Sequence, residues 1–217
     1  MIQFFDYAGV FVFAATGALA ASRRQLDIIG FLFLASLAGI GGGTLRDLVL
    51  GDAPVFWVRD PIYILVCAVV AVLIYFSAYL LESRYRMILW LDSIGLSAYC
   101  VMGAAKGLAL GFGPYIAVVT GILTATCGGI LRDIVSGDQS VLMRREIYVT
   151  AALAGAVSFT ILASWGVDPR LAALIGASVA FVVRGGALIF GWTLPSYRSR
   201  PGRSEEQLKR DGILPSD

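Results

Sequence analysis

The sequence predicts an all-α polytopic membrane protein with seven transmembrane helices, built as an inverted repeat of three helices plus a seventh. Three observations predict this class. Of the 217 residues, 58% are hydrophobic and only 15% are charged, whereas soluble domains average about 45–50% apolar and about 25% charged residues. The mean hydropathy is +0.80. A polar motif also occurs twice, separated by a fixed number of residues.

Apolar stretches long enough to cross a bilayer occur seven times. A helix needs about 20 apolar residues to cross a hydrocarbon core about 30 Å thick. The first stretch follows Met-Ile-Gln rather than a basic leader, which favours a retained span over a cleaved signal peptide. We expect one transmembrane domain over residues 1–194 and a polar cytoplasmic tail over 195–217. The expected spans lie near residues 4–21, 28–50, 61–81, 88–105, 114–131, 147–165 and 170–191.

The distribution of lysine and arginine predicts the orientation, because cytoplasmic loops carry an excess of both. We expect a topology with the N-terminus outside the cell and the C-terminus in the cytoplasm. This topology leaves few basic residues on the outer side, namely Arg46, Arg59, Lys106 and Arg170, and it places Arg184 inside the last span. The cytoplasmic segments would then hold 12 of the 17 basic residues, namely Arg23, Arg24, Arg84, Arg86, Arg132, Arg144, Arg145, Arg198, Arg200, Arg203, Lys209 and Arg210.

Several classes of function are disfavoured by composition. The chain has no histidine, the commonest metal ligand and the side chain best suited to proton transfer near neutral pH. Cys67, Cys100 and Cys127 lie in apolar stretches without Cys-x-x-Cys spacing and are expected to pack as small apolar residues. We therefore expect no metal site, no cofactor and no enzyme activity. The net charge of +2 does not indicate nucleic-acid binding.

The two copies of the polar motif define an internal repeat. Gly-Gly-Thr-Leu-Arg-Asp at 42–47 recurs as Gly-Gly-Ile-Leu-Arg-Asp at 128–133, an offset of 132 − 46 = 86 residues. Each unit, about 4–81 and about 88–165, contains three spans, so the second copy enters the membrane from the opposite side. Inverted repeats of this kind place a transport pathway at their interface. The same offset pairs Gly51-Asp52 with Gly137-Asp138, Asp6 with Asp92, Gly9 with Gly95, Gly17 with Gly103, and Arg59 with Arg145.

Glycines interrupt the second and fifth spans within the bilayer. The thirteen residues before Gly41 would rise only about 20 Å as a helix, so the span must continue through the glycines. Each glycine destabilises a helix interior by about 1 kcal/mol relative to alanine, which favours a kink or local unwinding. Backbone freed at that depth must face protein or water; the alternative is close helix packing. The candidate pathway residues are Gly41, Gly42, Gly43, Thr44, Thr126, Gly128 and Gly129.

Arg46, Asp47, Arg132 and Asp133 follow these glycines, where an uncompensated charge is costly. Adjacent residues on a helix point about 100° apart, so we expect pairing across the pseudo-twofold axis, Arg46 with Asp133 and Arg132 with Asp47. The alternative is that each arginine extends to the membrane surface.

Four further charges are candidates for the pathway. Asp6 and Asp92 begin the first and fourth spans, either as acidic mouths of a cation path or as favourable charges at helix N-termini. Lys106 stands where the first repeat has Ala20, and Arg184 lies inside the seventh span. Each is either a gate or counter-charge, or a residue that pairs locally.

The motifs at 41–47 and 127–133, with Gly51-Asp52 and the segment 54–61, resemble the prokaryotic branch of the trimeric intracellular cation (TRIC) channel family. Some bacterial members are described as glycine transporters. The resemblance covers roughly residues 4–162. It implies a homotrimer in the inner membrane of a bacterium, with a pore inside each protomer around the second and fifth spans, permeable to monovalent cations such as potassium.

Two functions remain open at this stage. A channel would use backbone carbonyls before each break and the hydroxyls of Thr44, Thr124 and Thr126 in place of hydration water. A carrier would hold the carboxylate of glycine or another small zwitterion at the helix N-terminus after a break, near Thr44 or Ile130. Both kinds of helix end exist at any break, so the sequence does not choose between them.

Overall fold

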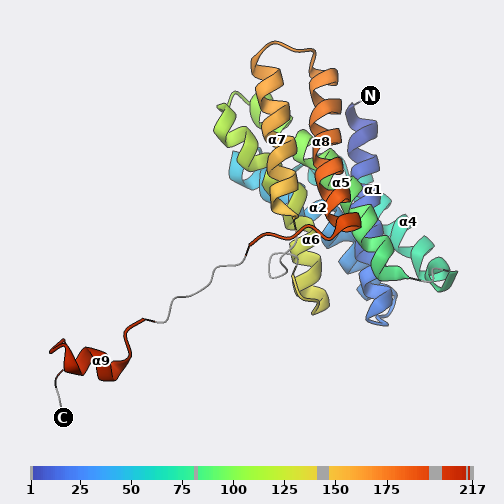
Figure 1. Cartoon of the computed structure of the whole chain (residues 1–217). Helices are drawn as coiled ribbons and strands as arrows, with labels where there is room; N and C mark the ends of the chain where they lie inside the picture. Colours follow the sequence, from blue (N-terminus) through green and yellow to red (C-terminus); the bar gives the residue numbers. More distant parts are fainter. Residues whose placement is uncertain (1, 81–82, 141–146, 196–201, 214, 216–217) are drawn as a thin grey trace.

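A computed structural model describes residues 2–80, 83–140, 147–195, 202–213 and 215, and these residues form helices and no β-strand. The all-helical prediction is therefore confirmed for this part of the chain. The long helices pack into one bundle (Figure 1). They are α1 (Ile2–Arg23), α2 (Ile28–Leu50), α3 (Phe56–Arg59), α4 (Ile62–Ser77) continued by the 3-10 turn η1 (Ala78–Leu80), α5 (Arg84–Ala109), α6 (Pro114–Ser136), α7 (Val149–Ser164), α8 (Pro169–Phe190) and α9 (Glu205–Arg210).

Five of these helices are long and apolar enough to cross a membrane: α2, α4 with η1, α5, α6 and α8. The helix α7 is apolar but has 16 residues, and α1 has 22 residues but is not among the five. Every expected span coincides with a helix. The count of seven membrane crossings stays a prediction.

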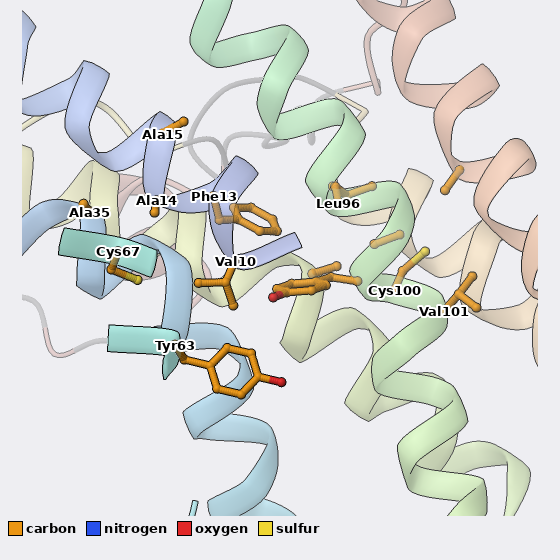
Figure 2. Packing of buried hydrophobic residues seen from close by; sticks show 14 of the residues in the cluster. Val10, Phe13, Ala14, Ala15, Ala35, Tyr63, Cys67, Leu96, Cys100 and Val101 are labelled. Carbon is orange, nitrogen blue, oxygen red and sulfur yellow. The ribbon is translucent and has the colours of Figure 1, made fainter. Parts of the chain in front are cut away.

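The repeat is visible in the packing. The first unit comprises α1, α2 and α4, and the second comprises α5, α6 and α7; α1 packs against α5, and α2 packs against α6. The added helix α8 lies against α5 and α7, and α7 and α8 together form a hairpin (Figure 1). Small residues fill much of the core. Figure 2 shows part of it, with Val10, Phe13, Ala14 and Ala15 from α1, Ala35 from α2, Tyr63 and Cys67 from α4, and Leu96, Cys100 and Val101 from α5.

The repeated Gly-Asp pairs end α2 and α6. Gly51 and Gly137 adopt the left-handed conformation, with φ of 67° and 68°, and donate their backbone N–H groups to carbonyls of the preceding turn. This conformation suits glycine because it has no Cβ. The two caps place Asp52 and Asp138 directly beyond the ends of these helices.

Two expectations about the helices are wrong. Both α2 and α6 run for 23 residues without a break, so the predicted local unwinding at Gly41–Gly43 and at Gly128 and Gly129 does not occur; a kink in the helix axes is not confirmed. Helix α5 begins at Arg84, which places Asp92 in its third turn. Asp92 is therefore not a charge at a helix N-terminus.

Candidate functional site

The glycines of α2 and α6 bring the two backbones into contact. A Cβ added to Gly42 would lie 2.3 Å from the carbonyl oxygen of Thr124, and one added to Gly128 would lie 2.4 Å from that of Ala38. These two contacts are equivalent at the offset of 86 residues, so the pseudo-twofold axis passes between them. The close-packing alternative is thus confirmed for these two glycines. The expected role of Gly41 to Thr44, Thr126, Gly128 and Gly129 in a pathway stays a prediction.

Threonine hydroxyls near this crossing donate to their own helices. Thr44 Oγ1 donates to the carbonyl of Ile40 at 2.7 Å and accepts a hydrogen bond from Trp57 Nε1 at 2.9 Å. Thr126 Oγ1 donates to the carbonyl of Ile122 at 2.8 Å. Because the protons point into the helices, the oxygen lone pairs are what these side chains present to their surroundings.

The end of α2 carries a group of charges that runs from the buried core to the surface, which we call the α2 cluster: Arg46, Asp47, Asp52, Arg59 and Lys106. Asp47 is fully buried and Arg46 is 5% exposed. The Asp47 carboxylate is 2.8 Å from Arg46 Nε and 2.6 Å from Lys106 Nζ. Lys106 Nζ also lies 2.7 Å from Asp52, which is paired with Arg59. Lys106 is thus a counter-charge shared by two aspartates.

The end of α6 carries the equivalent α6 cluster of Asp92, Arg132 and Asp133. Arg132 is 3% exposed and Asp92 is 2% exposed. Arg132 Nη1 lies 2.8 Å from Asp92 Oδ1, and Arg132 Nη2 lies 2.8 Å from Asp133 Oδ1. The first of these ion pairs ties α5 to α6.

The expected pairing across the axis, Arg46 with Asp133 and Arg132 with Asp47, is wrong. Each arginine instead binds the aspartate next to it in sequence. The argument from a 100° separation considered only the directions in which the side chains leave the helix, whereas a guanidinium at the end of four rotatable bonds can fold back to its neighbour. Nor do these arginines extend to the surface, since both are buried.

Tyrosines, which the sequence did not single out, join the starts of α1 and α4. Tyr63 donates to Asp6 at 2.7 Å, and Tyr7 donates to Asp60. Within the described residues, Asp6 forms no ion pair with a basic side chain. The sequence offered one signal for this contact. Tyr63 begins the third span of the first repeat, and Asp6 begins the first span of the same repeat.

Arg184 is packed against the start of α7. Its side chain is 1% exposed, donates to the carbonyl of Ile147 at 3.3 Å and lies 5.2 Å from the centre of the Tyr148 ring. The interpretation of Arg184 as a locally paired residue is supported by these contacts.

Charge pairs also join the two repeats at both ends of the bundle. Arg23 and Arg24, at the end of α1, lie 2.9 and 2.7 Å from Asp138. The equivalent contact at the other end joins Lys106 of α5 to Asp52. Hydrogen bonds from Arg59 and then Lys106 lower the pKa of Asp52 to about 2. The repeated Gly-Asp pairs were visible in the sequence, but their basic partners were not.

Solved structures resemble this arrangement closely. The trimeric intracellular cation channel orthologue from Rhodobacter sphaeroides superposes with a TM-score of 0.86 at 49% identity, over 88% of this chain and 98% of that chain. The chain belongs to the prokaryotic TRIC family. A second TRIC cation channel structure superposes with a TM-score of 0.83 at 26% identity, over 93% of this chain and all of that chain.

Sequence comparisons agree with membership in the TRIC family and with the repeat. The glycine transporter family model matches residues 3–79 and 89–164, two segments whose starts are 86 residues apart. The chain is 33% identical to the UPF0126 inner membrane protein YadS of Escherichia coli, over 91% of this chain and 96% of the relative. It is equally identical to a UPF0126 membrane protein of Vibrio cholerae, over 91% of this chain and 83% of the relative. The chain is a multi-pass membrane protein, and its channel-family neighbours indicate a non-enzymatic channel protein.

Proposed function

We propose that this chain forms a channel for monovalent cations of the potassium type, with one pore in each protomer of a homotrimer. The observation that carries the proposal is the likeness to the Rhodobacter sphaeroides TRIC orthologue, which is described as a trimeric cation channel and matches over 98% of its length at 49% identity. The level of identity makes a common activity the simplest expectation, while fold alone would not carry it.

The proposed pathway runs along α2 and α6 and passes the α2 cluster at one end and the α6 cluster at the other. Charged residues inside a membrane-spanning bundle are costly and mark pathways for ions or solutes. Asp47 and Asp92 are the two most deeply buried carboxylates of these clusters. Either can supply the negative charge that replaces part of a cation's hydration, and the oxygens of Thr44 and Thr126 can supply more.

In the proposed topology the seven helices cross the membrane with the N-terminus outside and the C-terminus in the cytoplasm. The contact of Arg23 and Arg24 with Asp138 supports it, because it places the end of α1 and the end of α6 on one side of the bundle. Both segments were expected to be cytoplasmic from their basic residues. Of the other residues used for that expectation, Arg144, Arg145, Arg198 and Arg200 lie outside the described part of the chain.

Recording from the purified protein in planar bilayers tests the proposal. Under a gradient of potassium chloride we expect unitary currents that reverse near the potassium equilibrium potential and disappear when potassium is replaced by a large organic cation. Asp47→Asn should reduce the unitary current, because it removes a fully buried negative charge. Asp211→Asn, at an exposed position in the tail, is the matched control and should conduct normally.

A carrier for glycine or another small zwitterion is the second candidate, and the name of the matching family model favours it. The same purified protein distinguishes the two. Saturable uptake of labelled glycine into proteoliposomes, with no unitary current under any gradient, would overturn the channel proposal.

A further inference from the structure

The segment between α2 and α4 folds back over the end of α2. Residues 53–59 of this segment, which we call the α3 lid, contain the short helix α3 and contact α2 through two hydrogen bonds. The backbone N–H of Phe56 donates to Asp47 Oδ2 at 2.9 Å. The indole Nε1 of Trp57 donates to Thr44 Oγ1 at 2.9 Å. The lid is thus attached to the two side chains of α2 that the proposed pathway offers to a cation.

The ring of Phe56 fills the space that Gly43 leaves open on α2. A Cβ on Gly43 would lie 2.6 Å from this ring. The guanidinium carbon of Arg46 lies 5.6 Å from the centre of the Phe56 ring, and the centre of the Tyr63 ring lies 4.8 Å from it. Apolar constrictions close ion pathways by excluding water. Phe56 places such an apolar group among charged and polar neighbours.

The lid covers the oxygens that a cation would need at this end of the bundle. Asp47 is fully buried, and the N–H of Phe56 binds one of its two carboxylate oxygens. The Thr44 hydroxyl donates its proton into α2, so the N–H of Trp57 takes one of the lone pairs that remain. A hydrated cation therefore reaches these oxygens from this end only after the lid has moved.

The chain on either side of the lid is held by other contacts. Before the lid, Asp52 lies 2.7 Å from Lys106 Nζ. After the lid, Asp60 accepts a hydrogen bond from Tyr7. The ion pair of Arg59 with Asp52 also ties the lid down, but the Arg59 side chain is 44% exposed, and exposed ion pairs contribute little. The lid is thus a short loop between two fixed ends.

We propose that the α3 lid is the gate at the α2 end of the pathway. Phe56 is the side chain that seals this end, and Trp57 is a positioning residue that holds the lid closed through Thr44. In the open state the lid lies away from α2, and the two donors that it carries bind water instead. The inference rests on the proposed transport function, since it describes how the solute reaches the α2 cluster.

Opening leaves no buried charge without a partner. When the N–H of Phe56 leaves Asp47, the carboxylate keeps Arg46 Nε at 2.8 Å and Lys106 Nζ at 2.6 Å. A buried carboxylate that lost its positive partners would make the open state very costly. The groups that separate from α2 are one backbone N–H, one indole N–H and one apolar ring, and both donors find acceptors in water.

Single-channel recording of lid variants tests the proposal. Trp57→Phe keeps an aromatic ring and removes the N–H, so it should raise the ratio of open to closed time about fivefold, the effect of one neutral hydrogen bond. The unitary current should stay the same, because the lid is away from α2 in the open state. Phe56→Ala removes the sealing ring and should raise the ratio further. Val58→Ala is the matched control, because Val58 is 48% exposed on the same short helix.

A ratio that is unchanged or lower in Trp57→Phe would overturn the proposal. A purely structural role for Trp57 would reduce the number of active channels and leave the ratio of open to closed time as it was. Currents in the wild type together with an unchanged ratio in Trp57→Phe would therefore reject the lid and leave the channel proposal standing.

Fluorescence measures the lid without any current. In full-length protein with Trp90, Trp165 and Trp192 replaced by phenylalanine, Trp57 is the one indole that acrylamide can quench. Thr44→Val removes the acceptor of the Trp57 N–H and should raise the quenching constant by up to about fivefold. Thr44→Ser keeps the hydroxyl and should leave it unchanged.

The two measurements separate the lid from the channel. Equal quenching in the Val and Ser variants at position 44 would overturn the lid, because the hydrogen bond would then not hold it in place. The expected difference between these variants, in a protein that passes no current under any gradient, would support the lid and reject the channel proposal.

Discussion

Replacing Gly42 by alanine should destabilise the bundle, although alanine is the better helix former. The added Cβ would lie 2.3 Å from the carbonyl oxygen of Thr124 and 3.2 Å from its carbon. Both are backbone atoms, so no rotamer change relieves the contact and α2 must move away from α6 by about 1 Å to reach ordinary van der Waals separation. Overpacking of this kind costs about 1–3 kcal/mol, and the helix preference of alanine offsets about 1 kcal/mol of it.

The net loss of up to about 2 kcal/mol corresponds to a decrease in melting temperature of up to about 8 °C for a chain of this size. Thermal unfolding of the purified protein in detergent, followed by intrinsic fluorescence, measures it. Gly41→Ala is the control, because its Cβ would lie 3.3 Å from the end of the Leu131 side chain, which can rotate away; its melting temperature should be unchanged or slightly higher. Gly128→Ala should behave as Gly42→Ala. Equal melting temperatures for the Gly41 and Gly42 variants would refute the reasoning.

Three further predictions follow from the charges at the helix ends. Because the pKa of Asp52 is lowered from 3.8 to about 2, its ionised form contributes stability that is present above pH 4 and is lost as the pH falls from about 4 to about 2. In thermal melts across this pH range, Asp52→Asn should therefore lose less stability than the wild type. Parallel curves of melting temperature against pH for the two proteins would contradict this. Lys106→Met leaves Asp47 with less compensating charge and should raise the potassium current, which Lys106→Arg should not; a lower current in the Met variant would argue against a cation pathway there. Arg24→Gln removes an ion pair of a 42% exposed side chain, so it should cost at most about 1 kcal/mol, and the difference should vanish in 1 M salt.

The helices and the repeat could be predicted from the sequence because both follow from patterns along the chain. Apolar runs located every long helix, and the match of 42–47 with 128–133 at five of six positions gave the offset of 86 residues that the family match reproduces. The expected unwinding at the glycines failed for a physical reason. Intrinsic helix preference is a weak term in a packed bundle, and glycine permits the backbone contacts of Gly42 with Thr124 and of Gly128 with Ala38, which stabilise the helices that glycine alone would weaken.

The charged site shows why repeat symmetry is an incomplete guide to contacts. Symmetry suggested that each arginine would pair with the motif aspartate of the other repeat, but Arg46 and Arg132 each bind within their own repeat. What distinguishes the two ends is the side chains that break the repeat: Lys106 compensates Asp47, while its counterpart Ala20 offers Asp133 no charge. The lysine that departs from the symmetry is therefore the residue that makes the two charge clusters differ.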